Sequence, residues 1–420
     1  MFEPLRHAAG RLFALGCLAG VLVAVGCDKN GRGDEDFRAG ENASMFTYVL
    51  ESDPETFDPA KMSGAPEGRM AFQLFEGLMA PAPTTENLDD PSDVIVPGVA
   101  REHEVSDDKK TYTFHLREDA RWSDGEPVTA HDFAFAWKRV LDPDTGADYV
   151  DMLHVIDGAK EFTEGKADFD EVGVEAVDDH TLEVELEDPT PYFLELTAFY
   201  TFFPAREDLV EEHGEDWTDP ENLVVNGAYQ MTEYLEQKQI LLEKNEEYWE
   251  ADEVDIEEAK ARIIADRNAV TNAYRSGELH WSGTSLPVSQ ISSFVAHPDY
   301  RQDPMLGVYF FRINVSDEDS PLAKKKVRQA LAMSLDRTSL VEDVLSGLHK
   351  QANNFVPPMT GWESSIEVEK ETKEARELLE EAGYEEGGKE LPKIELLYNT
   401  DEDHKLIAEA VQKQWSRTLG

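Results

Sequence analysis

Residues 121–133 read RWSDGEPVTAHDF, and they combine a turn signal with a helix start. The pair Asp124-Gly125 predicts a tight turn, because Asp hydrogen-bonds to nearby main-chain groups and Gly supplies positive φ. Thr129 predicts a helix N-cap, since its side-chain oxygen can accept a hydrogen bond from a main-chain amide of the first turn. The apolar residues that then share one face of the helix are Phe133, Trp137 and Val140. The stretch therefore predicts a turn that leads into an amphipathic helix.

Strand patterns occur on both sides of this turn. Residues 46–50 predict a buried strand where the folded part of the chain opens, and residues 394–398 predict another strand further on. Two segments with alternating apolar and polar residues predict half-buried strands, and their apolar residues are Tyr112, Phe114 and Leu116 in one and Leu182, Val184 and Leu186 in the other. Asn226-Gly227 predicts a turn that needs positive φ.

Helical patterns are interspersed with these strands. Apolar residues three and four apart predict three further helices, whose faces contain Val327, Ala330, Leu331 and Leu335, then Ala375, Leu378, Leu379 and Ala382, then Leu406, Ile407, Ala410 and Val411. The basic run 324–326 predicts the solvated start of the first of these helices rather than a nucleic-acid site, and Gly383 predicts the end of the second. The mixture of strands and helices predicts an α/β protein of several lobes.

The N-terminal residues differ in kind from the rest. Arg6 and Arg11 precede an apolar run over residues 12–26, which is shorter than the roughly 20 residues that a membrane span needs. A charged start, an apolar stretch and a small residue before the break predict a secretory signal over residues 1–26. Residues 27–45 then contain almost no apolar side chains until their end and predict a flexible tether.

Cys27 closes the apolar run in a stretch, VAVGC, that resembles a bacterial lipobox. In such a motif the cysteine is acylated and becomes the mature N-terminus. Ala24 stands where Leu is usual, and Cys17 is a competing position, although cleavage there would leave too short an apolar core. These are the two cysteines of the chain, so we expect no disulfide, no Cys-based metal site and no cofactor in the mature protein.

The chain is strongly acidic, with 88 Asp and Glu against 39 Lys and Arg and a formal net charge of −49. Charge of this size repels itself, and salt screens the repulsion. Two interpretations stay open: a halophilic surface, or an acidic protein that its charge keeps soluble. Either one argues against a nucleic-acid partner, because phosphate binding needs the opposite sign.

Sequence motifs for catalysis are missing. The chain has no glycine-rich phosphate loop, no H-E-x-x-H, no G-x-S-x-G and no cysteine pair. With 88 acidic residues, carboxylate pairs at catalytic spacing arise by chance, so no pair can be nominated as acid and base. Composition and motifs therefore favour a binding protein over an enzyme.

The opening stretch also resembles the signature of the peptide- and nickel-binding family of ABC-importer solute-binding proteins, and within it the chain looks most like periplasmic oligopeptide-binding proteins. Further stretches agree in the same order along the chain: 56–59 TFDP, 74–78 LFEGL, 113–117 TFHLR, 225–229 VNGAY, 274–278 YRSGE, 327–331 VRQAL and 397–400 LYNT. One match could arise by chance, but eight in order indicate a common fold.

The resemblance implies a two-lobed clamp that closes on its ligand about a hinge. The first lobe would comprise residues 46–75 and 204–302, extended by an inserted domain over residues 76–203, and residues 303–420 would form the second lobe. Family members continue beyond the position of Gly420, so we expect this lobe to be incomplete and to lack the aspartate that pairs with the α-amino group of a bound peptide.

The implied function is capture of short peptides in extended form and their delivery to the membrane permease of an ABC importer. The protein would be a monomeric lipoprotein in the periplasm or cell envelope, held to the membrane by its lipid anchor. One alternative keeps the fold but binds nickel, haem, a sugar or a signalling peptide. Another, from a different class, is a secreted hydrolase.

The resemblance also carries over ligand-binding positions. Main-chain groups of Ser63, Gly64 and Ala65 would meet the peptide, and Ser63 replaces an acid of close relatives. Tyr149 matches a pocket tyrosine, with an ordinary aromatic after a turn as its alternative. In the second lobe the polar pair Asn399 and His404 matches pocket residues, although His404 could simply start the last helix.

Two further positions fall in the implied pocket without matching the usual residues of the family. They are Thr284 and Arg312. Arg312 replaces an acidic residue, which leaves the charge preference for the ligand open.

Overall fold

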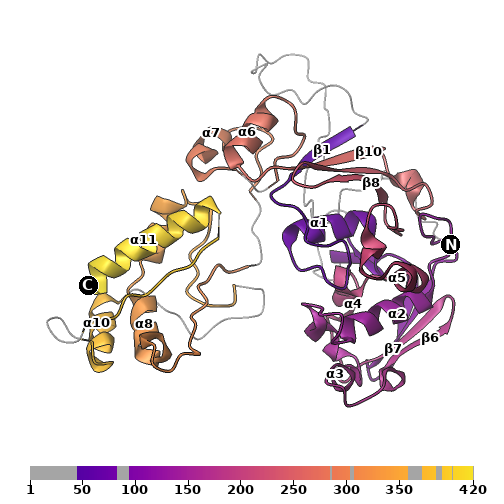
Figure 1. The fold of residues 1–420 in the computed structure, drawn as a ribbon, viewed down its shortest axis with the longest axis horizontal. Coiled ribbons are helices and arrows are strands. Elements are labelled where there is room, and N and C mark those ends of the chain that lie inside the picture. The colour runs from indigo at the N-terminus through magenta and orange to yellow at the C-terminus, as the bar shows by residue number, and fades with distance from the viewer. Residues whose placement is uncertain are drawn as a thin grey trace, which may run out of the picture. The chain divides into compact units, whose positions relative to one another are not determined.

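A computed structural model describes residues 45–82, 94–283, 286–302, 307–357, 371–384, 390–399 and 401–419. The chain divides into two compact units, Met1–Ser285 and Leu286–Gly420, which we call the first unit and the second unit. Figure 1 shows strands in the first unit and helices in both. The predicted signal, Cys27 and all but the last residue of the predicted tether lie outside the described residues.

The first sheet of the first unit joins distant parts of the chain, in the strand order β1-β10-β9-β8. Strand β1 pairs in parallel with β10, and the other neighbours are antiparallel. The strands are β1 Met45–Leu50, β8 Tyr229–Leu235, β9 Gln239–Lys244 and β10 Glu258–Ile263. The strand predicted at residues 46–50 is confirmed as β1. Strand β1 lies at the end of this strand order, and the segment that follows it leads to helix α1, Ala65–Leu74.

A second sheet, in the order β4-β5-β7-β6, is antiparallel throughout. Its strands are β4 Ala100–Val105, β5 Thr111–Leu116, β6 Val174–Asp178 and β7 Thr181–Glu185. Both predicted half-buried strands are confirmed here, as β5 and β7. The short strands β2 Met79–Pro81 and β3 Ile95–Pro97 pair with each other. The second sheet and this pair draw all their strands from the expected inserted domain, 76–203.

Helix α2, Ala130–Leu141, begins as the sequence predicts. Thr129 and Asp132 form a capping box, in which the Asp132 carboxylate accepts a hydrogen bond of 2.8 Å from the main-chain amide of Thr129. The preceding turn is also confirmed, with Gly125 at φ +88°. The remaining helices of the first unit are short: α3 Ala159–Thr163, α4 Phe193–Leu196, α5 Glu207–His213 and α6 Arg267–Arg275, with 3₁₀ turns at Val150–Val155, Phe169–Glu171, Tyr200–Phe202, Gly214–Thr218 and Ala251–Glu253.

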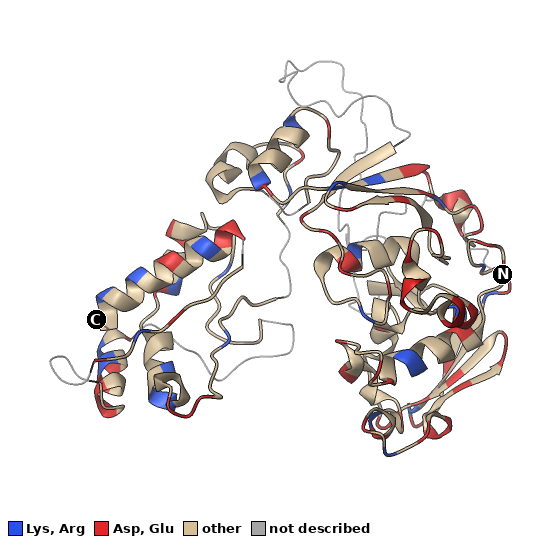
Figure 2. Ribbon diagram, viewed as in Figure 1, with Lys and Arg blue, Asp and Glu red and all other residues tan. Residues whose placement is uncertain are grey.

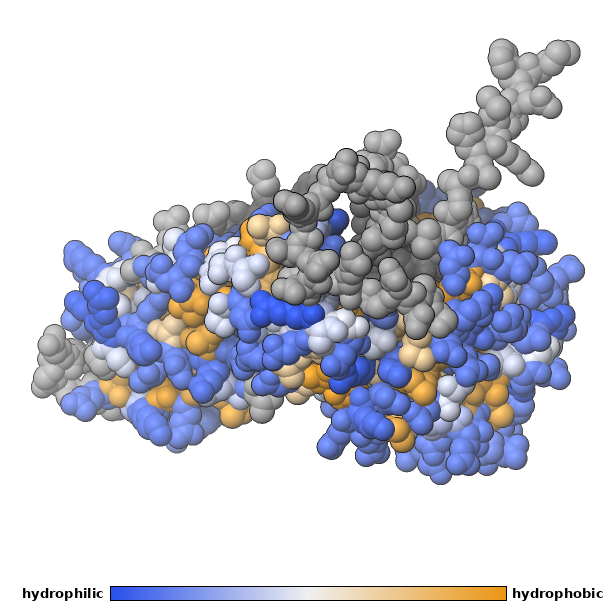
Figure 3. All heavy atoms as spheres, turned by 90° about the horizontal axis from the view of Figure 1, so that it is seen from above, coloured by the Kyte–Doolittle hydropathy of each residue, from blue (hydrophilic) through white to orange (hydrophobic). Residues whose placement is uncertain are grey.

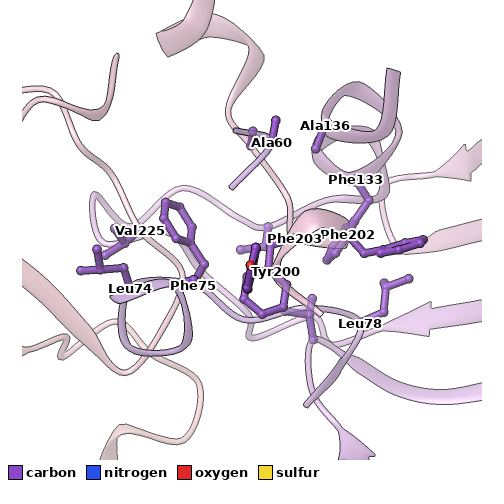
Figure 4. Close-up of a cluster of buried hydrophobic side chains, with 14 of the residues drawn as sticks. Ala60, Leu74, Phe75, Leu78, Phe133, Ala136, Tyr200, Phe202, Phe203 and Val225 are labelled. Atoms are coloured by element: carbon purple, nitrogen blue, oxygen red, sulfur yellow. The ribbon is translucent and has the colours of Figure 1, made fainter. Parts of the chain in front are cut away.

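One large apolar core takes side chains from both four-stranded sheets of the first unit, and a small separate cluster forms around Val49 and Val270. Figure 4 shows part of the large core, where Leu74 and Phe75 at the end of α1 and Phe133 of α2 gather with Phe202 and Phe203. Burial of each such side chain contributes on the order of 2 kcal/mol, so this core dominates the stability of the unit.

A buried ion pair joins the segment after β1 to helix α2. Arg139 of α2 donates to both carboxylate oxygens of Asp58, at 3.2 and 2.7 Å, and the indole of Trp217 donates to Asp58 as well. Both charged side chains are largely buried. Removing one partner would leave a buried charge unpaired, which typically costs about 3 to 5 kcal/mol. The segment after β1 is therefore tied to the part of the chain that carries the second sheet.

The predicted positive φ at Asn226-Gly227 is wrong, because neither residue is among those with positive φ. Gly227 is needed for a different reason. A Cβ added there would lie 2.6 Å from the main-chain carbon of Leu74 and 2.7 Å from the nitrogen of Phe75. Asn226 is buried, and its side chain hydrogen-bonds to the main-chain amide and carbonyl of Glu76. The pair thus brings two chain segments together without a special backbone angle.

The second unit contains helices and no strand among its described residues. Its elements are α7 Ile291–Phe294, α8 Lys325–Met333, α9 Arg337–Ser339, α10 Thr372–Glu381 and α11 Glu402–Leu419, with 3₁₀ turns at Val288–Gln290 and Pro321–Ala323 and a π-helical turn at Leu340–Val344. The three helices predicted from apolar spacing are confirmed as α8, α10 and α11. Gly383, at φ +91°, follows the end of α10 as predicted. Two small apolar clusters hold these helices, and Trp415 packs against both.

The strand predicted at residues 394–398 is wrong. These residues belong to no sheet, and Leu397 is 95% exposed. A strand needs a hydrogen-bonded neighbour, and within the described residues of this unit no segment pairs with this one. The unit division falls after Ser285, earlier than the lobe boundary expected between residues 302 and 303, which stays a prediction.

Acidic residues are spread over both units, as Figure 2 shows. Hydrophilic residues predominate on the face seen in Figure 3, with apolar residues in small groups between them. None of the helices within the described residues is long and apolar enough to cross a membrane.

Candidate functional site

The segment Ser63-Gly64-Ala65 lies in the first unit, at the N-terminus of α1. Ser63 and Ala65 are exposed and Gly64 is half-buried. Gly64 is the N-cap of α1, and Pro66 occupies the second helical position, where its missing N–H costs nothing. The carbonyls of Ser63 and Gly64 already accept hydrogen bonds, from Tyr149 and from the amide of Gly68, so this exposed helix start has main-chain N–H groups to offer a ligand.

Tyr149 lies next to this segment, although 86 residues separate it from Ser63 in the sequence. Its hydroxyl donates a hydrogen bond of 3.0 Å to the main-chain carbonyl of Ser63. Its ring packs edge-on against Phe199, at 5.6 Å between centroids, and against Tyr200. The structure therefore brings Tyr149 together with Ser63, Gly64 and Ala65. This proximity agrees with the pocket interpretation of Tyr149, which stays a prediction.

A buried carboxylate, which sequence reasoning missed, underlies the same segment. Glu67 is only 4% exposed, and its Oε1 accepts a hydrogen bond of 2.6 Å from the main-chain amide of Glu55. Its Oε2 is buried without a hydrogen-bond partner in the structure. A signal was present, because Glu at the third position of a helix often reaches back to the N-cap. The 88 acidic residues hid it.

Further along α1, Arg69 contacts an acidic side chain and an aromatic side chain from other segments. Arg69 donates to Glu51 at 2.7 Å, and its guanidinium lies 5.2 Å from the ring centre of Trp281. A Cβ added at Gly283 would lie 3.4 Å from a carboxylate oxygen of Glu51. The chain that leads to Thr284 thus passes this group, but Thr284 itself lies outside the described residues.

The second unit brings Asn399 and His404 together. The imidazole Nδ1 of His404 lies 2.7 Å from the side-chain oxygen of Asn399. The ring of Tyr309 packs on that of His404, with 4.7 Å between centroids. Burial, and then the charge of Asp401, raise the pKa of Tyr309. His404 belongs to α11, near its start, so both sequence interpretations of this residue agree with its place.

Arg312 is exposed in the second unit, in the irregular segment that also contains Tyr309. Among the described residues, the imidazole of His404 contacts Asn399 and Tyr309, and Arg312 is not part of these contacts. Its role as a pocket residue therefore stays a prediction.

Within the part of the chain that the structure describes, no three His, Cys, Asp or Glu side chains are placed to hold a metal ion. A hollow of about 360 Å³ lies elsewhere in the first unit, on the second sheet, and is lined by Arg101, His115, Leu116, Glu118, Asp178, Asp179, His180 and Thr181. None of the predicted site residues lines it.

Comparison with known proteins places the chain in a family. Residues 94–420 match the model of the bacterial extracellular solute-binding proteins, family 5 Middle. The oligopeptide-binding protein OppA of Bacillus subtilis is 37% identical over 412 residues, which cover 95% of this chain and 74% of that protein. The periplasmic oligopeptide-binding protein OppA of Escherichia coli is 37% identical over 384 residues, covering 88% of this chain and 68% of that protein.

Solved structures agree with the sequence matches. Haemophilus influenzae OppA, crystallised in complex with RPPGFSPFR, superimposes with a TM-score of 0.77 and 33% identity, over 90% of this chain and 74% of that one. The expected fold, a mixed α/β structure like that of periplasmic binding proteins, is therefore confirmed, and the family is one of solute-binding proteins rather than enzymes. The chain belongs to family 5 of the bacterial extracellular solute-binding proteins.

Proposed function

We propose that the protein captures short peptides in extended form outside the cytoplasm and hands them to the permease of an ABC importer. The observation that carries this proposal is the exposed main chain at residues 63–65, held by the hydroxyl of Tyr149. Main-chain groups recognise what all peptides share, and they allow one site to accept many sequences. The relationship to oligopeptide-binding proteins supports the same substrate class.

Polar groups in the second unit fit this substrate as well. Asn399 offers a side-chain amide, and His404 offers an imidazole whose ring nitrogens can donate or accept a hydrogen bond. Both groups can bond to main-chain amides and carbonyls of a peptide. We propose Asn399, His404, Arg312 and Thr284 as further ligand-binding residues.

Titration calorimetry tests peptide binding directly. The wild-type chain should release or absorb heat with tri-, tetra- and penta-alanine, and mass spectrometry of ligand that co-purifies should find peptides rather than nickel, haem or a sugar. A chain that binds none of the three peptides, or that hydrolyses them, would contradict the proposal.

Tyr149→Phe tests whether the hydroxyl of Tyr149 contributes to peptide binding. Loss of one hydrogen bond to the Ser63 carbonyl costs about 1 kcal/mol, so affinity for tri-alanine should fall about fivefold. Tyr192→Phe is the matched control, because Tyr192 is an exposed tyrosine of the same unit. Equal affinities for both variants would remove Tyr149 from the site.

We also propose that Cys27 carries the lipid anchor and that the protein is a monomer at the cell envelope. In cells, Cys27→Ser should release the protein from membranes, whereas Cys17→Ser should leave it attached. Acylated N-terminal peptide in the mass spectrum would identify the modified residue. Release by Cys17→Ser instead would move the cleavage site, and sedimentation of the anchor-free chain measures its mass in solution.

A further inference from the structure

The carboxylate of Glu67 occupies an unusual place at the start of α1. Glu67 is the third helical residue after the N-cap Gly64, and it is almost fully buried. One oxygen accepts from the amide of Glu55, and the other has no hydrogen-bond partner in the structure. An unpartnered buried oxygen costs about 1 to 3 kcal/mol, so its position needs a reason.

The absence of a side chain at Gly64 makes room for this oxygen. The backbone of Gly64, at φ −102° and ψ 171°, is extended and open to any residue. A Cβ added to Gly64 would nevertheless lie 2.0 Å from Oε2 of Glu67, 3.0 Å from Cδ and 3.5 Å from Oε1. All three nearest atoms belong to Glu67. A residue with a Cβ at position 64 would therefore have to displace the carboxylate of Glu67, whereas the backbone angle itself admits any residue.

Helix α2 shows the ordinary arrangement for comparison. Its third residue, Asp132, accepts from the amide and hydroxyl of Thr129 and from the indole of Trp122. A Ser, Thr, Asn or Asp at the N-cap is worth about 0.5 to 2 kcal/mol relative to Ala. Helix α1 lacks that side chain, and the carboxylate of Glu67 fills the space that it would occupy.

We propose that Glu67 is a positioning residue for peptide binding, which acts with Gly64 as one unit. Its carboxylate holds the helix start against the loop at Glu55 and keeps residue 64 free of a side chain. The main-chain groups of the segment from Ser63 to Ala65 therefore stay fixed and open to the ligand. This inference rests on the proposed peptide-binding function.

A double-mutant cycle tests the unit. Gly64→Ala should weaken the binding of tri-alanine at least tenfold, because the new methyl group displaces the Glu67 carboxylate. In the Glu67→Ala background the clash is gone, so the same change should cost less than threefold. Glu67→Gln keeps the volume, and Gly64→Ala should remain as harmful there as in the wild type. This pattern of affinities would show that the effect of Gly64→Ala depends on the volume of the Glu67 side chain and not on its charge.

Asp132→Asn is the control for a purely structural role. It changes a half-buried, hydrogen-bonded carboxyl group to an amide at the same helical position of α2, outside the site. It should lower the thermal midpoint of the chain and leave the affinity for tri-alanine within twofold of wild type. Gly64→Ala should show the opposite pattern, with a large change in affinity.

The outcomes distinguish this inference from the proposed function. If Gly64→Ala costs the same in the wild-type and Glu67→Ala backgrounds, the unit is overturned while peptide capture stands. If the wild-type chain binds no oligoalanine, peptide capture fails and the peptide role of Glu67 fails with it. Thermal midpoints of the wild type, Gly64→Ala, Glu67→Ala and the double variant, all without ligand, then still report whether Gly64 and Glu67 are coupled. Coupling without peptide binding would mean that the pair has a purely structural role.

Discussion

The two units of the molecule are stabilised very differently. The first unit has one large core that includes side chains of two four-stranded sheets and several helices, and one small separate cluster. The second unit holds its helices with two small clusters, and aromatic or aliphatic residues such as Tyr309, Phe310 and Phe355 stay exposed there. The number of apolar side chains buried together, rather than helix content, therefore separates a robust unit from a weaker one.

The charge divides unevenly as well. Residues 286–420 contain 24 Asp and Glu against 16 Lys and Arg, while residues 1–285 contain 64 against 23. The first unit thus carries a formal charge of −41 and the second −8. The larger core lies in the unit that repels itself more strongly, so burial and charge act in opposite directions there.

The largest expected effect comes from a matched pair of tryptophans. Trp137 in the first unit and Trp415 in the second each donate an indole hydrogen bond to a main-chain carbonyl, but only Trp137 is fully buried. Trp137→Ala should cost about 3 to 5 kcal/mol and Trp415→Ala about 1 to 3 kcal/mol. Urea unfolding followed by hydrogen-exchange mass spectrometry assigns each loss to its unit. Equal losses would contradict the difference in core size.

A pH effect comes next and belongs to the first unit. Burial raises the pKa of Glu76 from the ordinary 4.5 to about 7, against hydrogen bonds from Tyr248 and Trp249 and the charge of Arg117, which lower it, while Glu250 raises it further. The folded state therefore binds the proton more tightly than the unfolded state. The resulting stability is complete below about pH 4.5 and is lost as pH rises through 7.

Glu76→Gln should remove this dependence. Between pH 5 and pH 8 the free energy of unfolding should fall by about 2 to 3 kcal/mol less in the variant than in the wild type. Urea unfolding at both pH values measures the difference. Glu236→Gln, at an exposed position, is the control and should behave as wild type. An unchanged pH dependence in Glu76→Gln would show that this carboxyl does not titrate in that range.

A glycine at a close approach gives a smaller effect. Gly227→Ala pushes a methyl group against the main chain of Gln73 to Phe75 and should cost about 1 to 3 kcal/mol. Gly68→Ala is the comparison, because its added Cβ meets only the ring of Tyr200, at 3.3 Å, and alanine favours a helix. Its net effect on the thermal midpoint should be near zero. A tolerated alanine at position 227 would mean that the two segments can separate without loss.

Salt should produce the smallest change and the clearest test of charge. Lowering salt from 1 M to 0.1 M lengthens the screening distance from about 3 Å to about 10 Å. The first unit should lose on the order of 1 kcal/mol more than the second, or about 2 to 4 °C in its midpoint. Hydrogen exchange at both salt concentrations reports the two units separately. Flat stability from low to high salt would end the halophilic interpretation.

Local patterns allowed much of the fold to be predicted from sequence. The turn at Gly125 and the N-cap Thr129 depend on neighbours a few residues away, so short stretches sufficed. Positions that depend on distant partners failed. The strand at 394–398 would have needed a pairing neighbour, and Gly227 is required by main chain about 150 residues away.

The candidate site divides in the same way. The resemblance to a family supplied Ser63 and Tyr149, and their contact was invisible in the sequence because it joins two segments of the first unit. Glu67 was missed because its position near a helix start is a weak signal among 88 acidic residues, and its burial cannot be read locally. Burial is a property of the folded chain, and a single sequence does not record it.

The ion pair between Asp58 and Arg139 has a practical consequence for anyone who follows this molecule at work. It ties the turn after β1 to α2, which contacts the hairpin of β6 and β7, so the ion pair links that hairpin to the chain segment that leads into residues 63–65. A fluorophore attached at that hairpin would label this part of the first unit without touching the residues proposed to contact a peptide.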